Sequence, residues 1–428
     1  MVSQPPPRTL VVTGEPFNRR SATGITLAGL FEGWPSDRLF EIYTADLARS
    51  ADFEWQSWRM SNADLAGLGG WLRPLVPRRM TVTSDLPTLD GPKHSLRSKL
   101  RPWLAPWLDL IPYSPPPELL ERLDAFRPQI IYSMLGNIRL TRLVNALAHR
   151  FEIPVVPHFM DDWPTTYAVP GRSAATFVSR MMINRALARL MRQAPRGFAI
   201  GDQMAEEYAE RFSRPFESFM NPVDLPPEKV RDIGPHRTRL GYVGGLHLSR
   251  HVNLLEIAGA VSRLRTQGLE VDFRVWAPPA DLARHGPNLV AAGVQCSSLA
   301  PDEVPGALED LDIAVHVEAF GHREAEYTRL SVSTKIPQYF AAGIPVLVYG
   351  PSGAASCRYI VENGCGVGLG RPDGDPIVPL RAMIEDIASR RRMGANGRRL
   401  AAERHDAKVE RIRFRSQLIR AAGLARSG

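Results

Sequence analysis

The chain has 428 residues, of which 44% are hydrophobic and 23% are charged, and its formal net charge is +8. This length exceeds what one hydrophobic core usually supports and predicts two domains, while the composition excludes a fibrous or wholly disordered chain. No apolar run reaches the roughly 18 residues needed to cross a bilayer, and the polar, proline-rich start does not fit a signal peptide, so we expect a cytoplasmic protein.

The N-terminal part alternates strands with helices. It opens with a β-branched strand at 9–13, a glycine-bearing loop at 14–24 and an apolar-periodic helix at 25–31. Residues 51–117 are rich in Trp, Pro and Arg, break the alternation and are predicted to be an insertion. The alternation resumes with strands at 129–133, 154–157 and 197–200 and helices at 139–150 and 173–192. This order predicts parallel strands with right-handed crossovers.

A second series of strands and helices follows a proline-rich segment at 221–227 that suits a hinge. We expect strands at 238–243, 270–275, 313–317 and 345–348, and helices at 251–265, 302–308, 334–342 and 357–362, before an arginine-rich helical stretch at 376–422. The chain thus predicts an α/β fold of two doubly wound, Rossmann-like domains, 1–222 and 223–405. Residues 406–428 form a C-terminal helix and tail, for which packing back on the first domain is one option. Such domains bind ligands at the carboxyl ends of their strands.

Charge and cysteine content narrow the ligand classes. The three cysteines form neither a CxxC pair nor a zinc-ligand spacing, which argues against a disulfide framework and a structural metal site. A basic chain favours anionic partners, but no nucleic-acid-binding motif is recognisable. Small phosphorylated ligands are the better expectation, and nucleic acid is not expected as a partner.

The most informative segment is residues 328–347. Ser333 or Thr334 is a good N-cap, and the helix behind it ends at Gly343. Free backbone N–H groups at that helix start, with Lys335 beside them, predict a site for a diphosphate. Gln338, one turn along the same helix, is placed to face sugar hydroxyls. The alternative is a capped helix whose lysine is only exposed.

A second candidate anion site lies at the next strand-to-helix turn upstream. Gly244 and Gly245 follow a strand, and Arg250 stands at the start of the next helix. The glycines allow close approach of backbone to a phosphate, and the arginine supplies a bidentate charge. Two helix N-termini suited to binding an anion, both in one domain, indicate a phosphorylated ligand.

Together these segments resemble the GT-B glycosyltransferases, specifically the family 4-like retaining enzymes. The resemblance is carried by the 244–250 turn, the 334–346 helix, the Asn-Pro-Val-Asp step at 221–224 and the helix entry at 200–205, in the family's order. It implies two Rossmann-like domains facing each other across a cleft. It also implies that Arg250 and Lys335 hold the diphosphate of a nucleotide-sugar donor, with Gln338 at the usual place of a ribose-binding glutamate.

The chain departs from that family at two positions. Gln338 is neutral where a carboxylate is usual, and the residue eight positions before it is Leu330 instead of glutamate. Glu318 and Glu324 are candidates for contact with the donor sugar, with solvated loop carboxylates as the alternative.

The N-terminal domain supplies the remaining candidates. The loop at 13–24 resembles the family's glycine-bearing loop over the donor phosphates, so Gly24 is carried over, with Arg19 and Arg20 as added charge. His158, Asp161 and Asp162 follow a strand at the place of the family's catalytic loop. A base there can orient an acceptor hydroxyl, and Asp161 is favoured over Asp162. The alternative is a helix-capping aspartate pair with a core histidine.

Residues 93–108 of the insertion place leucines and tryptophans at helical spacing beside basic residues, a pattern typical of an interfacial helix. Two prolines interrupt it, so packing of the tryptophans inside the domain is the favoured alternative. Peripheral contact with the inner face of a membrane is therefore a hypothesis.

From the resemblance we expect a retaining glycosyltransferase acting in cell-envelope polysaccharide, glycolipid or natural-product biosynthesis. Its partners would be a nucleotide-sugar donor and a sugar, lipid-linked or small-molecule acceptor. No cofactor or metal is expected, because the chain has no DxD motif and cationic groups can stabilise the leaving diphosphate. A non-catalytic module that binds a nucleotide sugar or a partner enzyme, and a sugar-nucleotide epimerase, are the alternatives.

Overall fold

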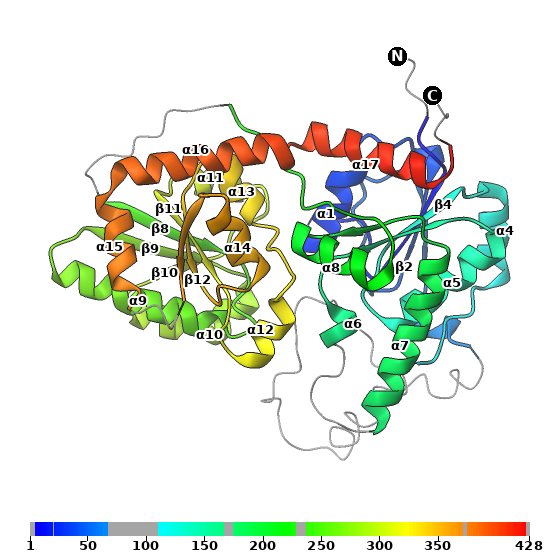
Figure 1. The fold of residues 1–428 in the computed structure, drawn as a ribbon, viewed down its shortest axis with the longest axis horizontal. Coiled ribbons are helices and arrows are strands. Elements are labelled where there is room, and N and C mark those ends of the chain that lie inside the picture. The colour runs from blue at the N-terminus through cyan, green and yellow to red at the C-terminus, as the bar shows by residue number, and fades with distance from the viewer. Residues whose placement is uncertain are drawn as a thin grey trace. The chain divides into compact units, whose positions relative to one another are not determined.

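The computed structural model describes residues 5–19, 21–66, 110–166, 174–227, 237–370 and 375–424. The chain divides into two compact units, Met1–Phe219 with Arg411–Gly428, and Met220–Glu410 (Figure 1). Each unit has one parallel sheet with helices packed on it, so the predicted α/β class with two doubly wound domains is confirmed. None of the helices in the described ranges combines the length and apolar composition that crossing a membrane requires.

The sheet of the first unit has seven described strands in the order β3-β2-β1-β4-β5-β6-β7, all parallel. Its strands are β1 (Thr9–Thr13), β2 (Leu39–Tyr43), β3 (Gln56–Arg59), β4 (Ile130–Met134), β5 (Val155–Phe159), β6 (Gly197–Ala199) and β7 (Phe216–Ser218). Every residue of β1, β4 and β5 is buried, as expected for central parallel strands covered on both faces. This burial explains why short, continuous apolar runs form these strands.

Six α-helices of the first unit lie between these strands in the sequence. They are α1 (Ala22–Phe31), α4 (Pro117–Phe126), α5 (Ile138–Phe151), α6 (Trp163–Thr166), α7 (Ala174–Arg192) and α8 (Asp202–Phe212), counted within the described ranges. One part of the predicted insertion belongs to the sheet, because residues 56–59 form edge strand β3 and pair with β2. The interfacial helix expected at 93–108 lies outside the described residues.

The second unit has six described strands in the order β10-β9-β8-β11-β12-β13, again all parallel. The strands are β8 (Thr238–Val243), β9 (Val271–Trp276), β10 (Gln295–Ser297), β11 (Ile313–Val317), β12 (Val346–Tyr349) and β13 (Gly366–Leu369). The helices are α9 (Arg250–Thr266), α10 (Pro279–Ala291), α11 (Val304–Glu309), α12 (His322–Thr328), α13 (Ile336–Ala341), α14 (Ala355–Glu362), α15 (Ile377–Glu385) and α16 (Ile387–Arg404). The centre of the sheet, β8 and β11, carries the residues of the candidate site.

The chain returns to the first unit through α17 (Ala407–Ala421). Phe414 on this helix is fully buried, and its ring lies 5.0 Å from Phe31, 5.4 Å from Phe219 and 5.4 Å from Tyr132 between centroids. Edge-on aromatic contacts of this kind stabilise beyond the area they bury. The last helix of the chain therefore completes the core of the first unit.

Replacing Phe414 with alanine should lower the free energy of unfolding by about 3–5 kcal/mol, because it empties a buried aromatic cluster. Ile412→Ala on the same helix is the matched control, since Ile412 is 69% exposed, and should change stability by less than about 0.5 kcal/mol. Denaturant unfolding of both variants measures the difference. Equal stabilities would contradict the packing of α17 in this core.

Candidate functional site

Two loops of the second unit leave the same edge of the sheet. β8 ends at Val243 and leads into the Gly244-Gly245 turn, and β11 ends at Val317 and leads into Glu318. β8 and β11 are paired in parallel, so both loops lie at the carboxyl edge, where open α/β sheets bind ligands. The loop between α12 and α13 adds Lys335 to the candidate residues.

The glycine turn is held on both sides. The Tyr242 hydroxyl donates to the Gly245 carbonyl at 2.7 Å, and the Leu246 N–H donates to Asp281 Oδ2 at 2.7 Å. A Cβ on Gly245 would stand 2.3 Å from the His247 ring, so a larger residue here would force this side chain to move. Nothing in the sequence pattern marks Asp281 as the anchor of this turn.

The turn enters α9 through a strained backbone. Leu248 and Ser249 both have left-handed φ angles, 56° and 57°, which are uncommon for residues with a side chain. Ser249 is the N-cap of α9, and its hydroxyl donates to Glu324 Oε1 at 3.4 Å, which links the turn to α12. Strain of this kind persists only where surrounding contacts hold it, and it clusters at functional sites.

Arg250, the first residue of α9, forms a buried ion pair with Glu318. Its Nη2 lies 3.2 Å from Oε2 and 3.3 Å from Oε1 of Glu318, and His316 Nε2 lies 3.2 Å from Oε1. Burial alone would raise the pKa of Glu318, but the charge of Arg250 and the proximity of His316 outweigh it and lower this pKa to about 2. Glu318 is only 2% exposed, so the alternative of a solvated loop carboxylate is wrong for this residue.

The helix that carries Lys335 and Gln338 begins later than predicted. α13 runs from Ile336 to Ala341, and its N-cap is Lys335, so the expected cap at Ser333 or Thr334 is wrong. The reason is a turn closed by a hydrogen bond from the Ile336 N–H to the Ser333 carbonyl, at 3.1 Å, which takes these two residues out of the helix. Ser333 Oγ instead accepts from the Lys335 N–H at 3.4 Å.

Lys335 is a partly buried cation for which no described residue supplies a counter-charge. Its ammonium group has no ion-pair partner among the residues that the structure describes, and burial lowers its pKa below the ordinary value. Gln338 Oε1 and Arg250 Nε are buried and likewise lack a hydrogen-bond partner within the described part of the chain. Three polar groups from this region therefore have unused bonding capacity, which an anionic or hydroxyl-bearing ligand can satisfy.

Tyr339 places α13 against the end of β8. Its hydroxyl oxygen lies 3.3 Å from both the nitrogen and the oxygen of Val243, the residue before the glycine turn. The structure thus brings the Lys335 helix to the Gly244-Gly245 turn, as a site on both segments requires. Leu330, at the position of the resembled family's first glutamate, is fully buried and belongs to the core.

In the first unit, Gly24 lies in the first turn of α1. The N-cap Ser21 accepts from the Gly24 N–H at 3.1 Å, and Asn18 Oδ1 accepts from the Ser21 N–H at 2.7 Å. A Cβ on Gly24 would stand 2.3 Å from the Asn18 amide, so glycine allows this loop to close on itself. Arg19 pairs with exposed Asp52 at 2.8 Å, and Arg20 lies outside the described residues.

His158 is a core histidine, which corrects its expected place at the edge of a cleft. It is fully buried in β5, with Nδ1 2.7 Å from the Tyr132 hydroxyl and Nε2 3.1 Å from the Phe219 carbonyl oxygen. Burial lowers its pKa to about 3, so the ring is neutral at pH 7. Both ring nitrogens are occupied, and this histidine cannot reach an acceptor hydroxyl.

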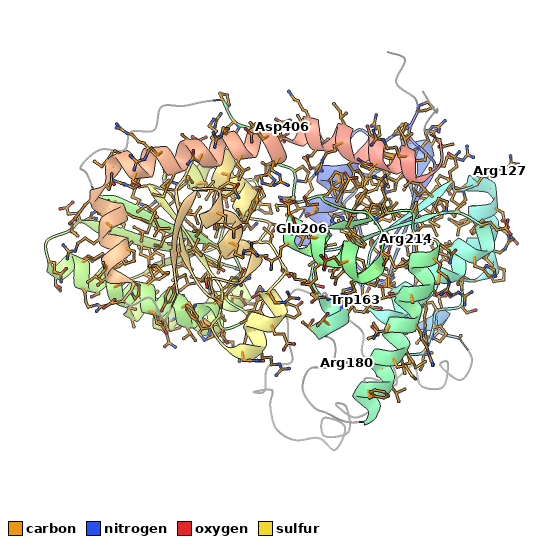
Figure 2. All side chains as sticks on the ribbon, viewed as in Figure 1. Arg127, Trp163, Arg180, Glu206, Arg214 and Asp406 are labelled. Carbon is orange, nitrogen blue, oxygen red and sulfur yellow. The ribbon has the colours of Figure 1, made fainter. Side chains whose placement is uncertain are left out.

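The two aspartates after β5 serve local structure. Asp161 Oδ1 accepts from the Trp163 N–H at 3.2 Å, at the start of α6, the helix on which Figure 2 labels Trp163. Asp162 is buried, and its Oδ1 accepts from the Tyr208 hydroxyl at 2.7 Å and from Thr165 at 2.9 Å. These contacts match the alternative of a capping aspartate pair, and only Asp161 is accessible enough to meet a ligand.

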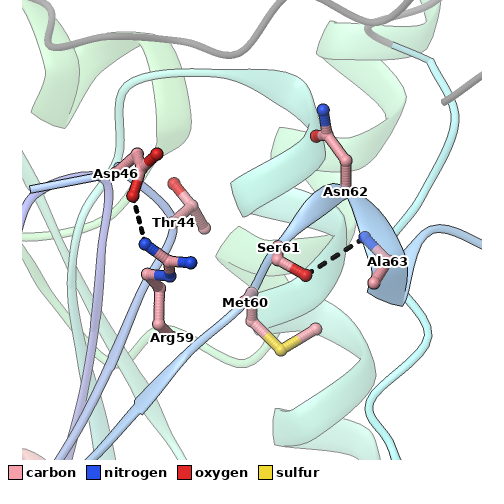
Figure 3. Close-up of a pocket in the computed structure, with 7 residues that line it drawn as sticks. All are labelled: Thr44, Asp46, Arg59, Met60, Ser61, Asn62 and Ala63. Carbon is pink, nitrogen blue, oxygen red and sulfur yellow. Dashed lines mark hydrogen bonds and ion pairs between the residues drawn. The ribbon is translucent and has the colours of Figure 1, made fainter. Parts of the chain in front are cut away.

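A polar pocket of about 240 Å³ lies at the carboxyl ends of β2 and β3 (Figure 3). Arg59 and Asp46 form an ion pair beside Thr44, and Ser61 Oγ accepts from the Ala63 N–H at 3.1 Å. Because the arginine charge is already matched, this lining suits a neutral hydroxyl-bearing molecule better than an anion. No sequence pattern pointed to this pocket, because five of its seven lining residues, 59–63, fall in the predicted insertion.

Among residues of known placement, no group of three or more His, Cys, Asp or Glu side chains could hold a metal ion.

Comparison with known proteins defines the fold. No family model and no curated protein match the chain. HepE of Anabaena, solved in complex with UDP and glucose, is 14% identical over 96% of this chain and 99% of its own, with a TM-score of 0.61. The α,α-trehalose-phosphate synthase (UDP-forming) from Burkholderia vietnamiensis is 10% identical over 99% of both chains, also with a TM-score of 0.61. At these identities the likeness shows the fold alone, the two Rossmann-like domains of GT-B proteins.

The buried pair predicts a pH-dependent contribution to stability. The pKa of Glu318 falls from 4.5 to about 2 on folding. This shift adds about 3 kcal/mol to the free energy of unfolding above pH 4.5, and about half of that at pH 3. Glu318→Gln should remove this contribution, so the difference from the unmodified chain should shrink as the pH falls from 4.5 toward 2. Denaturant unfolding at pH 7 and pH 3 measures it. Glu362→Gln, at an exposed ion pair, should show neither effect.

Proposed function

We propose that this chain is a retaining glycosyltransferase, similar to family 4, that transfers a sugar from a nucleotide-diphosphate sugar to an acceptor hydroxyl. The pathway would be cell-envelope polysaccharide, glycolipid or natural-product biosynthesis in the cytoplasm. The observation that carries the proposal is Lys335, a partly buried ammonium group for which no described residue supplies a counter-charge. Burying such a charge is costly unless an anion joins it, and a diphosphate supplies that anion.

Gln338 supports a nucleotide in particular. It lies three residues after Lys335, about 4.5 Å along the helix axis, and its buried Oε1 has no partner among the described residues. A ribose hydroxyl can donate to this oxygen while the diphosphate meets Lys335. The neutral amide makes a weaker bond than a carboxylate would, so we expect modest donor affinity.

Glu318 takes a different role from the one first expected, whereas Arg250 keeps its expected contact with the diphosphate. The guanidinium is held by Glu318 through Nη2, which leaves Nε without a described partner. In this proposal Arg250 reaches the diphosphate through Nε, and Glu318 positions the arginine and does not touch the sugar. The carboxylate also keeps the guanidinium charged, because its negative charge raises the pKa of Arg250 against the opposing effect of burial.

The chemistry follows from charge. The bond between the anomeric carbon and the diphosphate breaks, negative charge grows on the leaving group, and the acceptor oxygen bonds to the same carbon while its proton passes to the departing diphosphate oxygen. Arg250 is held in place by Glu318 before the reaction, and together with Lys335 it is proposed to stabilise this growing charge more than the bound donor. Asp161 is the accessible carboxylate of the β5 loop and is proposed to orient the acceptor hydroxyl. The fold shared with HepE, which has been solved with UDP-glucose, supports the donor class.

The pocket at β2 and β3 is the proposed acceptor subsite. Its hydroxyl, carboxylate and guanidinium groups can bond to several hydroxyls of one sugar ring, as neutral sugars require.

Lys335→Ala should weaken binding of UDP or another nucleoside diphosphate by about 10- to 100-fold, because a charge-assisted contact is lost. The rise in melting temperature with added nucleotide measures this affinity, since only the native state binds. Lys408→Ala, at an exposed lysine, is the control and should bind as the unmodified chain does. Unchanged affinity in Lys335→Ala would remove the basis of the proposal.

Incubation with UDP-, GDP- and dTDP-sugars separates the alternatives. Transfer to an acceptor or slow hydrolysis is the expected result. Binding with no reaction would indicate the non-catalytic module, which the neutral Gln338 favours, and an altered sugar without transfer would indicate an epimerase.

Arg59→Ala should raise the KM for a sugar acceptor by about tenfold and leave the KM for the donor unchanged, because the lost hydrogen bonds lie only in the pocket. The acceptor used is the best one found in a screen of mono- and disaccharides. Arg237→Ala, at an exposed arginine of the second unit, should change neither constant. A shift in donor KM with Arg59→Ala would contradict the assignment.

A further inference from the structure

Helix α7 presents an unusual outer face. It spans Ala174–Arg192, contains four arginines and has no acidic residue. Phe177, near its N-terminal end, is 71% exposed, although an aromatic ring of this size is normally covered. In Figure 1 this end of α7 extends beyond the strands of the first unit.

The helix has two opposed stripes. Ser179, Ile183, Leu187 and Leu190 are spaced by three or four residues, and all four are buried against the first unit. Phe177, Met181, Arg185, Ala188 and Arg192 follow the same spacing on the opposite side. The first stripe holds α7 in place. Since the described residues leave Phe177, Arg185, Ala188 and Arg192 exposed, the second stripe can meet a partner without unfolding the helix.

The outer stripe changes from apolar to basic side chains along its length. Exposed Phe177 and the half-exposed Val178 and Met181 form an apolar end, and Arg185, Arg189 and Arg192 form a basic continuation. These three arginines are exposed, and none has an ion-pair partner within the ranges that the structure describes.

The helix packed beside α7, α5, also has no acidic residue. Its Arg139 is buried and its Arg150 pairs with Asp124 of α4 at 3.2 Å, so α5 adds little free positive charge. Arg180, labelled in Figure 2, is a further exposed arginine of α7. The positive charge of this side therefore comes mainly from the exposed arginines of α7, which has no carboxylate of its own to offset them, whereas a typical surface mixes both signs.

We infer that the outer face of α7 docks on an anionic lipid bilayer, with Phe177, Val178 and Met181 entering the headgroup region and Arg185, Arg189 and Arg192 contacting lipid phosphates. The apolar end and the basic continuation match the two layers of a membrane surface, and a bilayer supplies the negative charge that the arginines lack. The protein would bind peripherally. This inference rests on α7 alone and does not depend on the nucleotide chemistry of the second unit.

The test is co-sedimentation of the full chain with vesicles of phosphatidylcholine alone and of phosphatidylcholine with 30% phosphatidylglycerol, at ~100 mM salt. The unmodified chain should bind the anionic vesicles and not the neutral ones. Phe177→Ser should weaken binding about tenfold. Arg185→Glu with Arg189→Glu should weaken it by about 30-fold or more, since each arginine near such a surface contributes about fivefold.

Matched controls distinguish an effect of the α7 surface on vesicle binding from an effect of the protein's net charge. Arg392→Glu with Arg420→Glu changes the net charge equally at exposed arginines elsewhere, and Ile412→Ser removes a comparably exposed apolar side chain. Both should retain binding, and all variants should keep the nucleotide-induced rise in melting temperature. Failure of the unmodified chain to bind anionic vesicles overturns the inference. An equal loss in the charge control, or full binding by the α7 variants, overturns the assignment to α7.

Discussion

The buried ion pair between Arg250 and Glu318 determines the arrangement of the candidate donor site. It joins the first residue of α9 to the loop after β11 and so fixes the distance between the two loops that leave the centre of the second sheet. Neither charge can separate from the other without remaining buried and uncompensated, which is strongly unfavourable. The glycine turn, its strained entry into α9 and the anchoring aspartate are all held within this frame.

The same edge of the sheet contains a second cation, which differs from Arg250 in having no counter-charge among the described residues. Arg250 has its counter-charge built into the fold, whereas Lys335 is partly buried with none among the described residues. The paired cation maintains the geometry of the site, and the unpaired one has free energy to gain from an anion. The sequence pattern, with one basic residue on each turn, does not distinguish the two cations. Their electrostatic surroundings do, and they predict different roles.

The sequence predicted strands that are rich in apolar or β-branched residues, such as those at 9–13, 238–243 and 313–317, which occur at those bounds. It missed β3, because an edge strand of mixed polarity resembles a loop. It placed Lys335 and Gln338 at the correct helix. It did not predict the buried hydrogen bonds of His158 or the pairing of Arg250 with Glu318. Those features depend on which strands are neighbours, and residues 68 positions apart carry no local signal of contact.

The return of the chain to the first unit through α17 has a consequence for synthesis on the ribosome. The second unit is one continuous segment, Met220–Glu410, and can acquire its full set of internal contacts as soon as that segment has emerged. The first unit lacks Phe414 and Leu418 until the final residues have left the exit tunnel. The half of the protein that is made first therefore reaches its native core last, and during translation its aromatic cluster remains open to chaperones or to non-native contacts.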